Sequence, residues 1–275
     1  MDLRLDTGGF SPEKRALLER LLLQKGIQRG SGARIPRRPS SAPAPLSHLQ
    51  EGLWFLDRLD PGQATYNIPC ATRIEGPLDA DALERALGEI ARRHEILRTV
   101  FPERGGRPLQ VVLPAGQWRL PRRDLTELAP AERPSEALRI ATEEARRPFD
   151  LVAGPVFRGE LLRLSEREHV LLFCIHHIAA DGWSFRVFTR ELTELYAAFA
   201  AGRPSPLAPL ALQFADFAVW QRAELAGTEL ERLLRFWRAY LAGAATLELP
   251  ADHGRAARPA ARGRHHSLAL SGELS

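Results

Sequence analysis

At 275 residues, with 44% hydrophobic and 26% charged content, the chain is long enough to bury a core and has an ordinary globular composition. It contains no run of eighteen apolar residues and no apolar segment near its N-terminus, which excludes a membrane partner and a signal peptide and predicts a cytoplasmic protein. Its two cysteines, Cys70 and Cys174, lie in apolar stretches without CxxC or Cys/His spacing, which predicts buried side chains rather than disulfides or a zinc site.

The net charge of +4 is unevenly distributed along the chain. Residues 1–44 contain nine Lys or Arg and four Asp or Glu, a net charge of +5, and the remainder has a net charge of −1. The basic residues between positions 25 and 38 lie in a segment without acids or aromatic rings, whereas nucleic-acid grooves usually add stacking rings or a docking motif. We therefore expect a solvated linker there and no nucleic-acid partner.

The first predicted element is an amphipathic helix over residues 12–25. Ser11 supplies a capping hydroxyl, Pro12 suits the first helical position, and Glu13 lies near the positive end of the helix dipole. Four leucines then form an apolar stripe, which needs a surface to cover it. That surface belongs either to the following domain or to another polypeptide, so residues 1–27 are expected to be a linker or docking segment.

Residues 28–44, rich in Pro, Arg, Gly and Ser, are expected to be a flexible linker. From residue 45 the pattern changes to a mixed α/β fold. Strands are expected over residues 70–75, 97–101, 109–113, 157–164 and 169–175, and helices over 79–94, 136–147, 184–200, 214–225 and 229–241. The polar turn 165–168 joins two of these strands into a hairpin. A strand-like piece over 267–270 precedes the last residues, where a new helix begins.

Residues 175–184 carry the side chains that suit chemistry. The strand before them is apolar on both alternating faces, which is typical of an interior strand. Because side chains alternate across a strand, His176 and His177 must point to opposite faces. His177 continues the face of Phe173 and lies nearest the strand end, where α/β sheets place ligands. We predict that His177 is an exposed base and His176 a packed, hydrogen-bonded structural residue.

The turn after the histidines is expected to organise the site. Asp181 is a good cap for the next helix, and a buried carboxylate there would need a cationic partner. Arg98 is the candidate within this chain; a partner outside it is the alternative. Gly182 allows close approach of a ligand to the backbone, or a positive φ. Trp183 and Ser184 are candidates for lining a substrate channel.

Three other interpretations compete for these residues. A lone histidine at a strand end is usually structural. Metal binding through His177 and Asp181 would need both on one helical face, and the strand and Gly182 indicate a turn instead, so we expect no metal. A catalytic triad with Ser184 lacks a nucleophile-elbow sequence around the serine.

Residues 45–275 resemble the N-terminal portion of a nonribosomal peptide synthetase condensation domain, a relative of chloramphenicol acetyltransferase. The resemblance depends on four motifs in order: Leu46-Ser47-His48-Leu49-Gln50-Glu51-Gly52-Leu53-Trp54-Phe55-Leu56, Arg93-His94-Glu95-Ile96-Leu97-Arg98-Thr99, His176-His177-xxx-Asp181-Gly182, and Phe214-Ala215-Asp216-Phe217-Ala218-Val219-Trp220. Alone, the histidine motif also fits other carrier- or coenzyme A-dependent acyltransferases. Departures at Gly52, Ala180, Phe214 and Phe217 concern substrate preference.

The resemblance implies an α/β lobe of the chloramphenicol acetyltransferase type, two-layered, with a mixed sheet, which is one half of a V-shaped pair. Residues 45–250 would form the N-terminal lobe, and 251–275 the start of a crossover to a missing second lobe. The substrate tunnel needs both lobes. We therefore expect the isolated chain to be inactive and to expose an apolar lobe interface.

The resemblance also implies peptide-bond formation, of an LCL-like subtype. Cyclisation relatives replace the two histidines with aspartates, and epimerisation relatives usually read Val-Ser-Trp where this chain has Trp183-Ser184-Phe185. Two peptidyl carrier proteins, upstream and downstream, would present the substrates on phosphopantetheine arms, with no cofactor bound by the domain itself. An adenylation domain is a further implied partner, and helix 12–25 could dock on another polypeptide of the synthetase.

His177 would take the proton of the attacking amine, because imidazole titrates near neutral pH, or it would position the amine or stabilise the oxyanion. Two rival functions remain: a non-catalytic docking module, and a free-standing acyltransferase that uses coenzyme A.

Overall fold

A computed structural model of the protein describes residues 35–38, 42–247 and 268. The predicted helix over 12–25, and all of the predicted strand over 267–270 except residue 268, lie outside the described residues.

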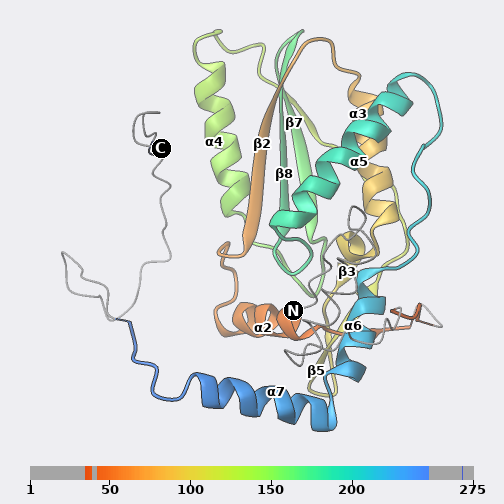
Figure 1. Ribbon diagram of the computed structural model, residues 1–275. Helices are drawn as coiled ribbons and strands as arrows, with labels where there is room; N and C mark the ends of the chain where they lie inside the picture. The colour runs from red at the N-terminus through yellow and green to blue at the C-terminus, as the bar shows by residue number, and fades with distance from the viewer. Residues whose placement is uncertain (1–34, 39–41, 248–267, 269–275) are drawn as a thin grey trace, which may run out of the picture.

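The main sheet has the strand order β2-β8-β7-β6 (Figure 1). Its strands are β2 (Asn67–Glu75), β6 (Arg122–Asp124), β7 (Phe157–Ser165) and β8 (Glu168–His176). β8 pairs antiparallel with β2 and β7, whereas β6 runs parallel to β7. The expected hairpin and mixed α/β sheet are therefore confirmed, and β8, the strand that ends at the histidines, is an interior strand.

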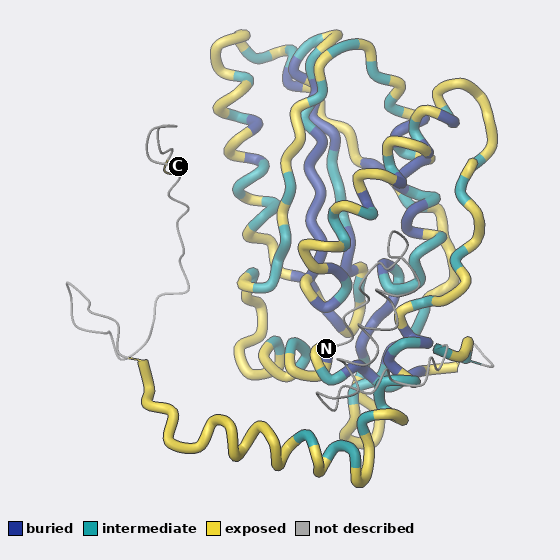
Figure 2. Tube along the Cα trace, in the orientation of Figure 1, coloured by how far each residue is buried: buried dark blue, intermediate teal, exposed yellow. Residues whose placement is uncertain are grey.

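Helices cover both faces of this sheet (Figure 1). On one face, α3 (Ala80–Arg93) and α5 (Gly182–Ala200) pack against Phe173 and Ile175 of β8. On the other face, α4 (Arg133–Arg146) contributes Ile140, which packs with Leu172 of β8. The resemblance implied two layers; α4 adds a third over part of the sheet. Figure 2 shows the consequence, since the central strands are the most buried part of the chain.

A second, smaller sheet lies beyond the end of β8. It consists of β1 (Ala44–Pro45), β3 (Thr99–Val100), β4 (Glu103–Arg104) and β5 (Arg107–Val112). Of the strand expected over 97–101, only Thr99–Val100 form a strand, β3, because residues 97 and 98 still belong to a 3₁₀ turn with local hydrogen bonds, η1 (Glu95–Arg98). Helix α2 (His48–Leu59) and helix α6 (Phe214–Glu224) complete this end of the molecule.

Helix α7 (Gly227–Tyr240) projects from the body of the protein and has no buried residue (Figure 1). Its apolar side chains Phe236, Trp237 and Tyr240 are 55%, 52% and 72% exposed and contact one another instead of a core. An apolar surface of this kind is typical of a helix whose partner lies elsewhere.

The two cysteines lie on neighbouring strands but face opposite sides of the sheet. Cys70 pairs with Phe173, and Cys174 pairs with Pro69, so the two thiols are separated by the sheet itself. Both are free; Cys174 is buried, as expected, and Cys70 is half-buried.

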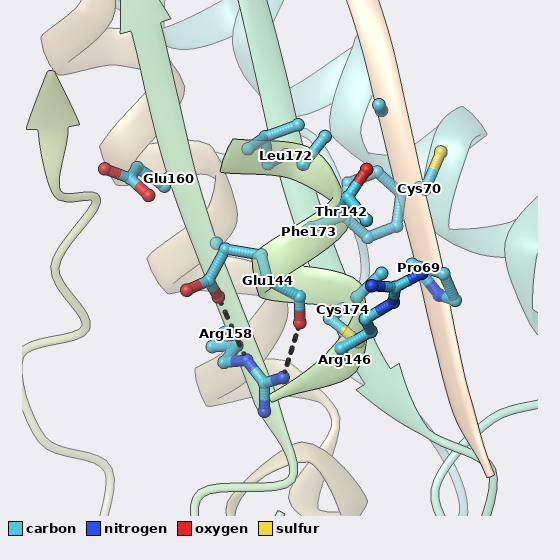
Figure 3. A pocket seen from close by; sticks show the side chains of 14 residues that line it. Pro69, Cys70, Thr142, Glu144, Arg146, Arg158, Glu160, Leu172, Phe173 and Cys174 are labelled. Atoms are coloured by element: carbon cyan, nitrogen blue, oxygen red, sulfur yellow. Dashed lines mark hydrogen bonds and ion pairs between the residues drawn. The ribbon is translucent and has the colours of Figure 1, made fainter. Parts of the chain in front are cut away.

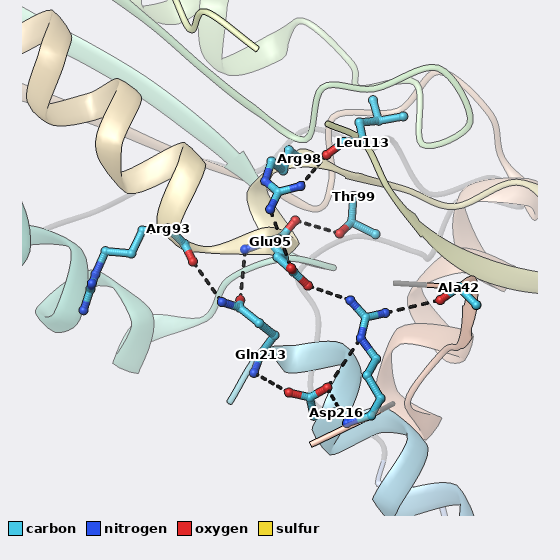
Figure 4. A network of polar contacts seen from close by, with 9 residues as sticks. Ala42, Arg93, Glu95, Arg98, Thr99, Leu113, Gln213 and Asp216 are labelled. Carbon is cyan, nitrogen blue, oxygen red and sulfur yellow. Dashed lines mark hydrogen bonds and ion pairs between the residues drawn. The ribbon is translucent and has the colours of Figure 1, made fainter. Parts of the chain in front are cut away.

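The described part of the expected linker contains a buried ion pair (Figure 4). The Arg38 guanidinium lies 2.6 Å from Glu95 and 3.4 Å from Asp216, and the side chain of Arg38 is only 9% exposed. Its backbone N–H donates to the same Asp216 carboxylate, which is 2% exposed. The solvated linker that the charge pattern predicted is therefore wrong at Arg38, because two acids far along the chain bind it.

We expect Arg38→Ala to lower the free energy of unfolding by about 3 kcal/mol, because Asp216 then remains buried without its cation. Urea denaturation of the variant measures this effect. Arg37→Ala is the matched control, since Arg37 is the exposed neighbour. Equal unfolding midpoints for the two variants would show that the Arg38 ion pair contributes nothing to stability.

Candidate active site

His176 is the last residue of β8 and lies inside the core. It is 3% exposed, its ring meets Phe149 edge-on at 5.9 Å, and Tyr66 lies 6.3 Å away on another side. Its side chain shares the face of Leu172 and Cys174, as the alternation of β8 requires. His176 is therefore part of the packing that supports the turn, and no incoming substrate can reach it.

The protonation state of His176 follows from its hydrogen bond. Its Nδ1 accepts from the backbone N–H of Ile178 at 3.1 Å, so the ring nitrogen that carries the proton is Nε2. Burial, and secondarily the proximity of His177, lowers the pKa of His176 to about 4. The imidazole is consequently neutral at pH 7 and serves as a hydrogen-bond acceptor for the turn.

His177 leaves the strand on the opposite side and is exposed. Its backbone N–H donates to the carbonyl of Tyr66 at 2.8 Å, which fixes the main chain at this point. The next bonds close the turn: the N–H of Ala179 donates to the carbonyl of His176 at 2.9 Å. The backbone at His177 is thus held on both sides while its imidazole faces solvent.

Helix α2 also holds this turn, through Gln50. The sequence pattern does not show that this residue contributes to the site. Gln50, only 2% exposed, donates from Nε2 to the carbonyl of Ile178 at 3.2 Å. Ser47 and Gln50 form a capping box at the start of α2, which fixes the Gln50 side chain. The Ser-x-x-Gln pattern predicts a helix start, but the contact with Ile178 requires the fold.

Asp181 caps the N-terminus of α5. Its carboxylate accepts from the backbone N–H of Ser184 at 2.9 Å and from the Ser184 hydroxyl at 2.7 Å. These hydrogen bonds with Ser184 lower the pKa of Asp181, and His177 adds a smaller effect in the same direction. Because the Ser184 hydroxyl is engaged with Asp181, it does not form a triad with His177.

Arg98 does not reach Asp181. Its guanidinium donates to the carbonyl of Leu113 and lies 3.6 Å from Glu95 (Figure 4). The expected pairing of Arg98 with Asp181 is therefore wrong: Asp181 is exposed and bonded to its own helix, so it does not need a buried cation. Arg98 supports the second motif instead.

Gly182 and Trp183 open helix α5. Gly182 is the first helical residue, has no positive φ, and a Cβ there would meet nothing within 4 Å, so of its two expected roles only the close approach of a ligand remains. Trp183 is 71% exposed, with the Arg186 guanidinium 5.4 Å from its ring. Both residues face open space beside His177, where the absence of a Gly182 side chain leaves room for a ligand.

A cavity of about 280 Å³ lies beneath this turn, between η1, α5 and the loop before α6. Ile175, Ala179, Ala180, Trp183 and Ser184 belong to its wall, which thus includes residues on both sides of His177 in the sequence but not His177 itself.

Another cavity, of about 310 Å³, lies between α4 and the sheet and contains no comparable chemistry (Figure 3). Arg158 donates to the Glu144 carboxylate at 3.2 Å and stacks on Phe149 at 3.9 Å, so these charges satisfy each other. Burial raises the pKa of the Cys174 thiol to about 11, which keeps it protonated and unreactive.

The described residues limit what the site can do. Within residues 35–38, 42–247 and 268, no group of three or more His, Cys, Asp or Glu side chains lies close enough to hold a metal ion. No helix in this part of the chain combines the length and apolar composition needed to cross a membrane. What the geometry offers is one exposed imidazole on a rigid turn, which suits proton transfer or hydrogen bonding to a substrate.

We expect the stability of the fold to decrease as the pH falls from 6.5 to 4, because the unfolded chain protonates His176 near pH 6.5 and the folded chain only near pH 4. Between pH 7 and pH 4.5 this effect amounts to about 2.5 kcal/mol. His176→Asn keeps an acceptor for the N–H of Ile178 and does not titrate. Over the same pH range, the unfolding free energy of this variant should therefore decrease by about 2.5 kcal/mol less than that of the wild type. Parallel pH dependences for the two proteins would contradict a buried neutral His176.

Known proteins resemble this chain over most of its length. A component of the linear gramicidin synthase of Brevibacillus parabrevis is 48% identical over 86% of this chain and 3% of that protein. Phosphinothricin tripeptide synthetase PhsC of Streptomyces viridochromogenes is 41% identical over 100% of this chain and 25% of that protein. The chain thus spans a small part of these curated relatives.

Solved structures also resemble this chain. The X-domain from teicoplanin biosynthesis superposes with a TM-score of 0.71 at 37% identity, and the first condensation domain of the calcium-dependent antibiotic synthetase with a TM-score of 0.65 at 26% identity. The match covers 82% and 74% of this chain, respectively, and 49% of each solved chain. A family model for the condensation domain matches residues 41–275. The chain therefore belongs to the condensation domain family of nonribosomal peptide synthetases.

Proposed function

We propose that this chain contributes the reactive imidazole to amide formation between two thioester substrates. The donor is an acyl or peptidyl thioester, and the acceptor is an aminoacyl thioester with a free α-amine. The observation that carries the proposal is the different fate of the two histidines: His176 is sealed and neutral, whereas His177 is exposed on a turn fixed by backbone hydrogen bonds.

The reaction forms a C–N bond at the donor carbonyl and breaks its C–S bond. The attacking amine must lose a proton, which His177 accepts, and the departing thiolate takes up a proton in turn. Imidazole is the side chain best suited to accept such a proton near neutral pH. The alternative role, positioning the amine or the oxyanion, uses the same exposed ring, and fixed donors at that position are also worth several orders of magnitude in rate.

Both substrates would be carried on the phosphopantetheine arms of carrier proteins, with an adenylation domain supplying the aminoacyl groups. His177 is exposed among the described residues, and the chain covers 49% of each of the two solved chains compared above. A second lobe would therefore supply the other wall of the tunnel. The exposed apolar side of α7 is consistent with a fold that is completed by further structure.

A docking function is the second candidate, because the teicoplanin X-domain has been solved in complex with OxyB at 38% identity to this chain. A recruiting surface does not need an imidazole on a fixed turn, so the geometry at His177 favours the catalytic proposal. A free-standing acyltransferase using coenzyme A is the third candidate, and a carrier-loaded substrate distinguishes it from the first.

In the complete domain, we expect His177→Ala to lower the rate of amide formation by about 10²- to 10⁴-fold, the usual contribution of a positioned proton acceptor. Single-turnover assays with two carrier-loaded substrates measure this rate. The folded fraction should not change, since the side chain is exposed. Arg190→Ala, an exposed position on helix α5 after the turn, is the control. Normal turnover by a folded His177→Ala variant would favour the docking function.

For Asp181, we expect Asp181→Ala to lower the unfolding free energy by about 1 kcal/mol through loss of the α5 cap. Asp181→Asn keeps a side-chain acceptor for the Ser184 N–H and should retain most of that stability. If Asp181 acts by organising the turn, Asp181→Asn also retains most of the amide-forming activity. A stable but inactive Asp181→Asn variant would show that the negative charge beside His177 matters directly.

A further inference from the structure

The cavity beneath the His177 turn is apolar and has a single ionisable side chain among its described lining. Its wall includes Ile90, Ile175, Val187, Phe188 and Leu212, together with His94. The described residues that line it include no Asp, Glu, Lys or Arg. At about 280 Å³ it is near the lower limit of small-molecule pockets, a size that suits one side chain and not a whole substrate.

His94 is held in the wall by a buried carboxylate. Its Nε2 lies 2.7 Å from the carboxylate of Glu191. Glu191 is only 3% exposed and also forms an ion pair with Arg93 at 3.3 Å. An ionised carboxylate can only accept, so Nε2 must carry the hydrogen of this bond. In the neutral form of the imidazole the other ring nitrogen, Nδ1, is therefore the acceptor, and among the described residues nothing donates to it.

The cavity is preformed, because the loop that closes it is fixed by hydrogen bonds. Arg93 donates to the carbonyl of Ala208 at 2.5 Å. Gln213 donates to the carbonyl of Arg93 at 3.0 Å and accepts from the N–H of Glu95 at 3.0 Å (Figure 4). The loop before α6 therefore cannot collapse into the space without breaking these hydrogen bonds.

We propose that this cavity binds the side chain of one of the two condensing groups, and that His94 is a specificity-determining residue for it. The favoured side chain is apolar along its length and ends in a hydrogen-bond donor, such as a phenol hydroxyl or an indole N–H, which donates to Nδ1 of His94. Charged side chains are rejected because the wall offers no counter-ion for them. This inference rests on the proposed function, since residues on both sides of His177 in the sequence line the cavity.

The test uses the complete synthetase domain and non-reactive amide analogues of tyrosyl-, phenylalanyl-, alanyl- and lysyl-pantetheine. Analogues with a free amine represent the acceptor, and N-acetylated analogues represent the donor, so the two series show which condensing group occupies the cavity. Calorimetry measures binding, and amide formation is measured in parallel with the corresponding thioesters.

Leu212→Trp places a large ring in the cavity wall, and we expect it to weaken binding of the tyrosyl analogue about tenfold or more in one series while changing alanyl binding less than about twofold. Leu138→Trp is the control, because Leu138 is 69% exposed on α4 and does not line the cavity. Equal weakening of all analogues, or none, would overturn the proposal.

His94→Phe removes the acceptor and keeps an aromatic ring. We expect the wild type to bind the tyrosyl analogue about tenfold more tightly than the phenylalanyl one, and the variant to lose that preference. Unchanged preference would overturn the role of His94; should this variant not fold, the tyrosyl preference of the wild type and the effect of Leu212→Trp decide alone. The wild type could form no amide with any pair of thioesters while Leu212→Trp still weakens binding of the tyrosyl analogue. That result would contradict the proposed function and support the binding of a side chain in the cavity.

Discussion

The geometry of the candidate active site depends on the end of one buried strand. β8 is covered on both faces, so its last residue, His176, is buried, and His177 points to the opposite side at the turn where the strand has ended. The Nδ1 of His176 accepts from Ile178, which ties the buried ring to the turn it supports. The exposed position of His177 is therefore a consequence of how its neighbour is packed.

Around this turn, segments far apart in sequence are connected by buried polar contacts. Gln50 of α2 reaches the carbonyl of Ile178, and Arg38 joins Glu95 to Asp216. Each contact pairs a charge or amide that would be costly to bury alone. The motifs that characterise the family are thus largely parts of one scaffold, with His177 as the exposed group that they position.

The same scaffold connects the turn to the cavity beneath it. Arg93 contacts both Glu191, which orients His94, and the loop that closes the cavity. A shift in this loop would move the wall of the cavity, part of which is formed by Ala179 and Ala180 of the turn. The backbone of the turn itself is held by other contacts, from Tyr66 and Gln50.

Periodicity and local pattern were enough to predict the alternation of β8, most of the helix and strand order from residue 67 to 240, and the four motifs. They did not indicate the burial of Arg38 or the true partners of Arg98, and α2 was not among the predicted helices although the Ser-x-x-Gln pattern marks its start. Those features depend on which distant residues meet. The packing of the whole fold decides whether a charged side chain has a buried partner. It also decides whether a carboxylate such as Asp181 forms its hydrogen bonds within its own helix.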